Sequence, residues 1–102
     1  MFQTQTASEV HRRLMRHEPV VVLDVREADE WLEGHIPGAR HIPLGELPLR
    51  LAELDPSVET IVVCHSGVRS ARACQFLAAH GFRAVNMAGG MLQWPGEVAF
   101  GP

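Results

Sequence analysis

The residues of this sequence whose types and spacing could do chemistry lie in one short segment, Cys64-His65-Ser66-Gly67-Val68-Arg69. The cysteine thiolate is a strong nucleophile near neutral pH. Ser66 and Gly67 are typical of a turn, and Arg69 adds a cation at C-x4-R spacing from the thiol. This combination predicts an activated thiol inside an anion-binding loop.

The segments on either side of this loop indicate how the thiol is positioned. Residues 61–63 are apolar and typical of a buried strand, and residues 70–80 have the pattern of a helix closed by Gly81. Cys64 would then end a strand, and Arg69 would open a helix. Amide N–H groups of a turn and of a first helical turn have no partner within the helix and can point toward an anion. We therefore expect the helix dipole and the nearby guanidinium to lower the pKa of the Cys64 thiol.

The rest of the chain alternates between helical and extended patterns. We expect helices at residues 7–16, 28–33, 47–54, 68–80 and 89–93, and strands at residues 20–25, 39–42, 60–64 and 84–87. Residues 20–25 form a continuous β-branched run, as in a parallel strand that is covered on both faces. Strands that alternate with helices at short intervals predict an α/β fold with a mainly parallel sheet and helices on both faces.

Chemistry-bearing residues follow three of the expected strands. Asp24 and Cys64 lie at the ends of two strands, and the turn at residues 87–90 follows a third. In parallel sheets, ligands bind beyond the carboxyl ends of the strands. These three segments should therefore gather around one site.

Length and composition exclude several classes of protein. A chain of 102 residues is one domain with room for a core, and 46% apolar and 21% charged residues are ordinary for a globular protein. A net charge of −3 without a basic run argues against a nucleic-acid partner. The apolar run at residues 20–23 is too short to span a membrane, and the N-terminus lacks the pattern of a signal peptide. We expect a cytoplasmic monomer without a membrane partner.

The two cysteines are expected to stay unpaired. Cys64 would end a strand, whereas Cys74 would lie within the following helix, too far along its axis to form a disulfide. Cys74 is better interpreted as a small buried apolar residue. The chain has no C-x-x-C motif, and its six histidines are scattered, so no metal site is predicted.

Three segments together resemble the rhodanese family of single-domain sulfurtransferases over nearly the whole chain. They are residues 23–26 (LDVR) with 30–39 (EWLEGHIPGA), residues 63–70 (VCHSGVRS), and residues 87–94 (MAGGMLQW). Each segment alone is a modest signal, but their order and spacing are specific. The resemblance implies one rhodanese-like domain over residues 1–102, with a mainly parallel sheet of about five strands flanked by helices.

The resemblance also implies a persulfide mechanism without metal or organic cofactor. The thiolate of Cys64 would attack the outer sulfur of a small anionic donor such as thiosulfate, release sulfite and pass the bound sulfur to cyanide, a thiol or an acceptor protein. The cradle for the sulfur would be formed by the backbone amides of His65, Ser66, Gly67, Val68, Arg69 and Ser70. The planar fork of Arg69 would bind the sulfonate end of thiosulfate.

The sequence departs from the better-known family pattern at His65. Many members that use thiosulfate carry Arg or Lys there. A neutral histidine weakens the positive field around the thiol, so the preferred donor stays open. We expect His65 to make the activity depend on pH near neutrality.

Other residues near the expected site are interpreted as support. Asp24 and Arg26 bracket a strand end and should tie loops together, because a catalytic carboxylate beside the thiol would raise the pKa of the cysteine. His35 lies in a Gly/Pro turn and should form structural hydrogen bonds. The pair Gly89-Gly90 should permit close backbone approach near the site.

Three alternative functions stay open. A phosphatase or arsenate-handling enzyme also uses a cysteine and an arginine around an anion, but at C-x5-R spacing, one residue longer than here. A non-catalytic binding module on the same fold would usually lack the cysteine. A sulfur carrier for a dedicated partner protein would keep both the cysteine and the loop.

Overall fold

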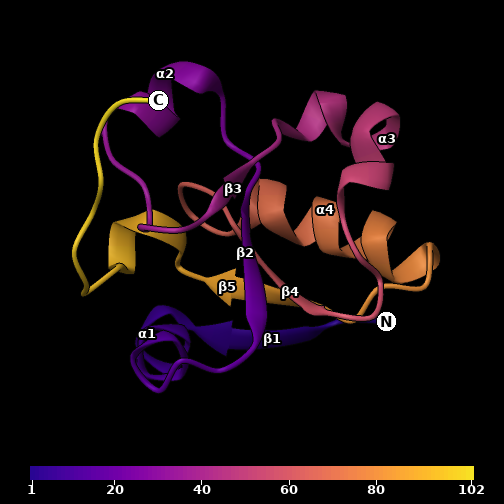
Figure 1. Ribbon diagram of the computed structural model, residues 1–102, viewed down its shortest axis with the longest axis horizontal. Helices are drawn as coiled ribbons and strands as arrows, with labels where there is room; N and C mark the ends of the chain where they lie inside the picture. Colours follow the sequence, from indigo (N-terminus) through magenta and orange to yellow (C-terminus); the bar gives the residue numbers. More distant parts are fainter.

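Five parallel strands form the central sheet in the computed structural model, which describes residues 1–102 (Figure 1). The strands are β1 (Gln3–Thr6), β2 (Val20–Asp24), β3 (Arg40–His41), β4 (Glu59–Val63) and β5 (Ala84–Ala88). Their order across the sheet is β1-β5-β4-β2-β3. The predicted α/β class with a parallel sheet is therefore confirmed.

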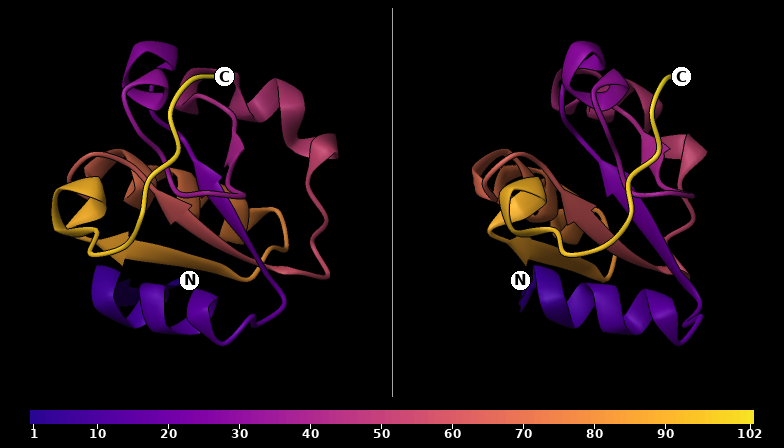
Figure 2. Two further views of the ribbon diagram at one scale, coloured as in Figure 1. Left: turned by 60° about the vertical axis from the view of Figure 1, so that its left-hand side comes forward. Right: turned by 90° about the vertical axis from the view of Figure 1, so that its left-hand side faces the viewer.

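Helices cover both faces of this sheet. They are α1 (Ala7–Met15), α2 (Ala28–Leu32), α3 (Leu47–Arg50) and α4 (Val68–Ala79), with 3-10 turns η1 (Leu44–Glu46), η2 (Leu51–Glu53) and η3 (Gly90–Gln93). Figure 2 shows α1 on one face of the sheet and α4 on the opposite face. None of the helices combines the length and the apolar character needed to cross a bilayer.

The alternation of side chains along each strand divides the core between the two faces. Val22, Ile61 and Val85 point toward α1 and pack with its Ala7 and Val10. The neighbouring positions on the strands point toward α3 and α4 and form the second cluster, which contains Leu23, Val62, Cys64, Ala73, Cys74, Leu77 and Ala84. Because successive strand residues face opposite sides, strands buried on both faces are apolar throughout.

One strand was not among those expected from the sequence. The segment Gln3–Thr6 (QTQT) has no apolar alternation, yet it forms the edge strand β1 and pairs with β5. Its pairing is made by the backbone, so its side chains give little signal. Thr6 then caps α1, in a capping box with Glu9.

The predicted helix at residues 47–54 is wrong in its extent. Only Leu47–Arg50 is α-helical, and it is preceded by η1 and followed by η2. Pro48 lies in the first turn of α3, where the missing N–H of proline is tolerated. The segment is therefore a chain of short turns.

The register of the sheet aligns the strand ends that carry the expected site. Asp24 of β2 lies opposite Val63 of β4, and Val62 lies opposite Asn86 of β5. The predicted meeting of Asp24, Cys64 and residues 87–90 at one edge is confirmed by this register.

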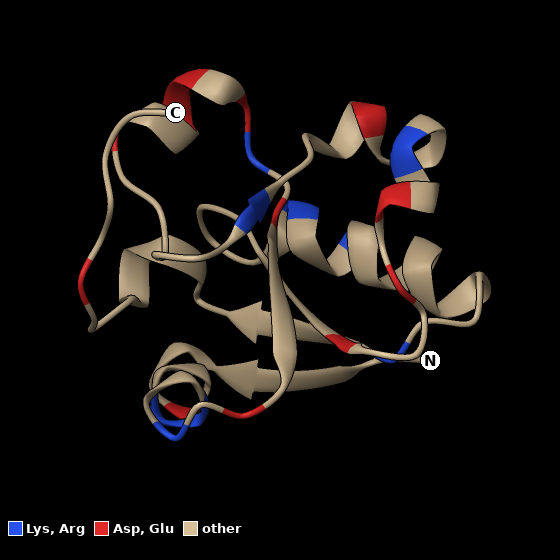
Figure 3. Ribbon diagram, in the orientation of Figure 1, with Lys and Arg blue, Asp and Glu red and all other residues tan.

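Charged residues lie mainly on the helices and connections around this sheet (Figure 3).

Candidate active site

Cys64 follows β4 directly and lies at the bottom of a tight loop that leads into α4. Its residue is 1% exposed. Gly67 precedes the first residue of α4 with a φ of 108°, a left-handed conformation that favours glycine. A Cβ on Gly67 would lie 3.3 Å from the Gly89 amide nitrogen. Glycine at this position therefore lets the loop close around the sulfur without backbone strain or a tight contact with Gly89.

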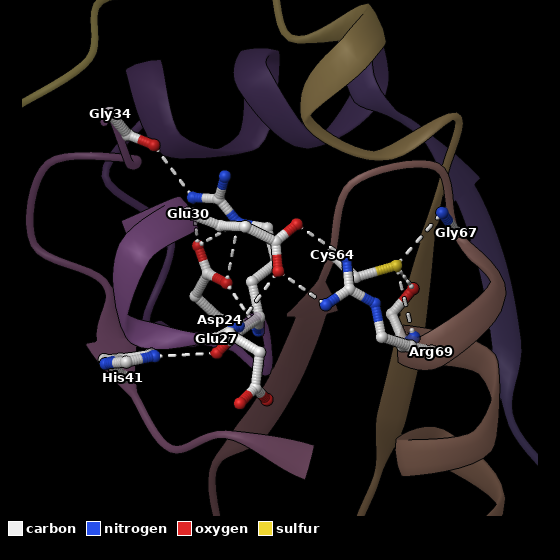
Figure 4. Close-up of polar contacts among 10 residues, drawn as sticks. Asp24, Glu27, Glu30, Gly34, His41, Cys64, Gly67 and Arg69 are labelled. Carbon is white, nitrogen blue, oxygen red and sulfur yellow. Dashed lines mark hydrogen bonds and ion pairs between the residues drawn. The ribbon is translucent and has the colours of Figure 1, made fainter. Parts of the chain in front are cut away.

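The sulfur atom of Cys64 is surrounded by hydrogen-bond donors (Figure 4). The amides of Gly67 and Ser70 donate to Sγ at 3.1 and 3.3 Å, and the Ser70 hydroxyl lies 3.2 Å away. Burial of the thiol opposes its ionisation, but the hydrogen bonds from Ser70, Gly67 and the Ser66 amide outweigh burial and lower the pKa of Cys64. The site thus favours a thiolate.

The loop residues differ in what they offer the sulfur. Of the six amides expected to form the cradle, those of Gly67 and Ser70 donate to Sγ at 3.1 and 3.3 Å, and the Ser66 amide also helps to lower the pKa of the thiol. The side chains of His65, Ser66 and Val68 are exposed at the surface. The roles of these three side chains toward a donor stay predictions.

Cys74 has a contrasting environment in the core. It is fully buried on α4, and burial raises the pKa of its thiol to about 12. Both cysteines are free, as expected. The prediction that Cys74 is a small buried apolar residue is confirmed.

Arg69 is bound by a carboxylate of the same chain. Its two terminal nitrogens donate to the two carboxylate oxygens of Glu30 on α2, at 2.7 and 2.8 Å (Figure 4). The hydrogen bonds from Arg69 lower the pKa of Glu30 to about 2. Partial burial of the carboxylate opposes this shift, and the hydrogen bond from the Glu27 amide adds to it. Hydrogen bonding to Glu30 likewise raises the pKa of Arg69. Binding of a donor by Arg69 stays a prediction, and it requires sharing or displacing this carboxylate.

Asp24 and Arg26 form a buried ion pair at the end of β2. The Arg26 guanidinium donates to Asp24 Oδ2 at 2.8 Å and to the Gly34 carbonyl at 2.8 Å. The Arg26 amide donates to Asp24 Oδ1 at 3.0 Å. The Arg26 carbonyl in turn accepts a hydrogen bond from His41. These hydrogen bonds join the end of β2 to Gly34 and to His41 of β3, which is the loop-tying role predicted for the pair.

The turn after β5 packs against the backbone of the cysteine loop. A Cβ on Gly90 would lie 2.4 Å from the carbonyl oxygen of His65 and 2.5 Å from that of Cys64. The amide of Met91 donates to the Cys64 carbonyl at 2.8 Å, and the amide of Leu92 donates to the His65 carbonyl at 3.1 Å. The predicted close approach at Gly89-Gly90 is confirmed.

His35 forms the structural hydrogen bonds predicted for it. Its Nδ1 is 2.8 Å from the Trp31 carbonyl, and its ring stacks on the Trp31 indole with 3.5 Å between centroids. Its backbone pairs with Ala99 in an isolated antiparallel bridge. His35 therefore ties the turn after α2 to the C-terminal segment.

Two residues that contact the site were not singled out from the sequence. Glu30 pairs with Arg69, and Asn86 on β5 accepts a hydrogen bond from the Ser70 hydroxyl. The available signal for Asn86 is its place as a polar residue within the apolar strand Ala84–Ala88. No group of three or more His, Cys, Asp or Glu residues is placed to hold a metal ion.

Comparison with known proteins gives consistent matches. Residues 6–97 match the rhodanese-like domain family. The chain is 38% identical over 92 residues to the putative sulfurtransferase YtwF of Bacillus subtilis. This match covers 90% of this chain and 89% of YtwF. The chain is also 34% identical over 98 residues to the thiosulfate sulfurtransferase GlpE of Pseudomonas fluorescens. This match covers 89% of this chain and 88% of GlpE.

The fold has close counterparts among solved structures. The crystal structure of a rhodanese-like domain protein from Staphylococcus aureus superimposes with a TM-score of 0.91 at 34% sequence identity. The match covers 99% of this chain and 100% of the other. The fold and the sequence therefore indicate the same family.

Proposed function

Because the chain belongs to the rhodanese-like family of sulfurtransferases, we propose that it transfers sulfane sulfur through a persulfide on Cys64. The observation that supports this most directly is the set of donors around Sγ. The amides of Gly67 and Ser70 donate to the sulfur at 3.1 and 3.3 Å. Such donors stabilise a thiolate and would equally stabilise an anionic persulfide.

The first half of the reaction loads the enzyme. The Cys64 thiolate attacks the outer sulfur of thiosulfate, and the S–S bond of the donor breaks. Its electron pair leaves with sulfite, and Cys64 retains the sulfur as an anionic persulfide. The amides of Gly67 and Ser70, which donate to Sγ, are near enough to stabilise the negative charge as it moves to the outer sulfur.

The second half returns the thiolate. An acceptor, either cyanide or a thiolate, attacks the outer sulfur of the persulfide. The Cys64–sulfur bond breaks, and its electron pair stays on Cys64. The products are thiocyanate or an acceptor persulfide, together with enzyme ready for another cycle. No external oxidant or reductant is needed.

An anionic donor is supported by the chemistry around the thiol. Arg69 presents a planar fork that can bind a sulfonate group. GlpE, 34% identical to this chain, is a thiosulfate sulfurtransferase. Glu30 already holds the Arg69 fork, so thiosulfate would compete with this carboxylate.

The test is the intact mass of the purified protein after incubation with thiosulfate, beside a Cys64→Ser control. A gain of about 32 Da, one sulfur atom, is expected on the wild type and should be lost on addition of cyanide. The control should gain nothing.

Absence of the adduct with thiosulfate, mercaptopyruvate and small-molecule persulfides would contradict the proposed reaction. Hydrolysis of an aryl phosphate that depends on Cys64 would instead support a phosphatase. An adduct that passes rapidly to one protein and slowly to cyanide would identify a sulfur carrier.

A further inference from the structure

The hydroxyl of Ser70 lies between two groups that could accept its single hydrogen. Its Oγ is 3.2 Å from Cys64 Sγ, and it also donates to Oδ1 of Asn86 on the neighbouring strand β5. A hydroxyl donates one hydrogen bond at a time. The acceptor that receives this hydrogen therefore depends on whether Cys64 is protonated.

Chemistry fixes the orientation of the Asn86 side chain. Its Nδ2 donates to the Gly67 carbonyl at 3.2 Å, and a carbonyl oxygen can only accept. Oδ1 must therefore face Ser70. Asn86 is 8% exposed, and the Ser70 hydroxyl is the one donor to its Oδ1. The same amide thus contacts both residues whose backbone N–H groups bind the sulfur.

When Cys64 is protonated, each group in the series Cys64, Ser70 and Asn86 has a hydrogen-bond partner. The thiol donates to Ser70 Oγ, and the Ser70 hydroxyl donates to Asn86 Oδ1. When Cys64 ionises, the sulfur needs donors. If the Ser70 hydroxyl turns its hydrogen toward the sulfur, the buried Oδ1 of Asn86 loses its donor. If the hydrogen stays directed toward Asn86, the lone pairs of Ser70 Oγ face the negative sulfur of Cys64. Either arrangement carries a penalty that the protonated state avoids.

We propose that Asn86 is a positioning residue that acts through the Ser70 hydroxyl to limit the fraction of resting Cys64 present as thiolate. The amides of Gly67 and Ser70 favour the thiolate, and Asn86 opposes them. The proposal rests on the proposed function in taking Cys64 as the nucleophile. The ionisation of Cys64 can nevertheless be measured without any sulfur transfer, so failure of one proposal is distinguishable from failure of the other.

The titratable groups near Cys64 come from other elements than the one that carries Asn86. They are His65, Arg69 and Cys74 on the loop and α4, Asp24 and Arg26 at the end of β2, and Glu27 and Glu30, which face Arg69. Residues 84–93, which form β5 and η3, contain no titratable side chain. Removal of Asn86 therefore changes the hydrogen bonds at the sulfur without changing any charge on its own element.

The experiment measures the pH dependence of iodoacetamide alkylation at Cys64 in the native protein. Trypsin separates the two cysteines, because Arg69 and Arg72 lie between Cys64 and Cys74. The Asn86→Leu variant removes both polar atoms at similar volume. We expect it to lower the pKa of Cys64 by about one unit, the equivalent of one buried hydrogen bond.

A double-mutant cycle distinguishes the proposed route from general loosening of the loop. In a Ser70→Ala background, Asn86→Leu should leave the alkylation profile unchanged, because the connecting hydroxyl is gone. A loop that merely loosens would lose amide donors and raise the pKa of Cys64 in both backgrounds. A rise, no change in the single variant, or an equal fall in both backgrounds would overturn the proposal.

Two further measurements cover the case in which the leucine variant does not fold. Asn86→Ala deletes the same polar atoms with a smaller side chain, and the same fall is expected. In the wild-type protein, the Asn86 side-chain carbonyl carbon should change its NMR chemical shift with the midpoint found by alkylation, because ionisation of Cys64 either withdraws the Ser70 hydrogen from Oδ1 or places a negative sulfur against the hydroxyl that donates to it. A signal that stays constant through that titration would contradict the proposal.

Discussion

The carboxylate of Glu30 and the guanidinium of Arg69 form a two-point ion pair between segments 39 residues apart in the sequence. The same carboxylate accepts the Glu27 amide at 3.0 Å, which closes the first turn of α2. One side chain therefore fixes the start of α2 and joins it to the first turn of α4. The predicted binder of the donor anion is held by an internal anion.

Glu30→Gln tests whether this internal carboxylate competes with the donor. A glutamine keeps the size of the side chain but removes the charge that neutralises Arg69. If Arg69 binds thiosulfate, we expect KM for thiosulfate to fall several-fold, with kcat changed less, because removal of the competing charge strengthens binding of the donor. Steady-state kinetics with varied thiosulfate measure this effect. An unchanged or increased KM would show that Arg69 does not bind the donor or needs Glu30 to orient it.

Acid stability should also report on Glu30. Its pKa is lowered to about 2 in the folded protein by the hydrogen bonds from Arg69, against an ordinary value near 4.5. A carboxyl group whose pKa is lowered by folding stabilises the folded protein at pH values above its pKa in the unfolded chain. For Glu30 this contribution is lost as the pH falls from about 4.5 toward 2. Because both side chains are partly exposed, we expect about 1–2 kcal/mol.

Urea unfolding at several pH values in this window measures the loss. The Glu30→Gln variant should be less stable than the wild type at neutral pH and should approach it as the pH falls. A constant difference between the two proteins across the window would exclude titration of Glu30 as the cause.

The cysteine loop was predictable from sequence because its signals are local. An apolar strand, a Ser/Gly turn and a helix start are adjacent in the chain, so Cys64 and its amide donors could be assigned together. The Glu30–Arg69 pair depends on how α2 packs against α4, and short-range patterns carry no information on such packing. The link from Ser70 to Asn86 likewise crosses between two elements. The edge strand Gln3–Thr6 was missed because backbone pairing, rather than side-chain burial, defines it.

Cys74 should be dispensable for sulfur transfer but sensitive to polarity. Its thiol is buried and has a pKa raised to about 12, so it contributes no thiolate near neutral pH. We expect Cys74→Ala to retain activity. Cys74→Ser should destabilise the fold by about 1–3 kcal/mol, because it buries a hydroxyl among apolar side chains. Thermal unfolding and the thiosulfate assay measure the two effects. Loss of activity in a folded Cys74→Ala protein would indicate that the second thiol takes part in turnover.

Gly90 gives a test of the contact between η3 and the cysteine loop, and Gly81 offers a matched control. Both glycines have positive φ, 58° and 87°, but a Cβ at Gly90 would meet the backbone of Cys64 and His65, whereas nothing lies within 4 Å of one at Gly81. Gly81→Ala should therefore cost only the backbone strain, about 1 kcal/mol. Gly90→Ala should cost a further 1–3 kcal/mol, roughly, from overpacking. It should also slow persulfide formation, because the loop that presents the donors to Sγ must shift. Chemical unfolding and the rate of the mass gain measure both effects, and equal behaviour of the two variants would show that the η3 contact does not hold the loop.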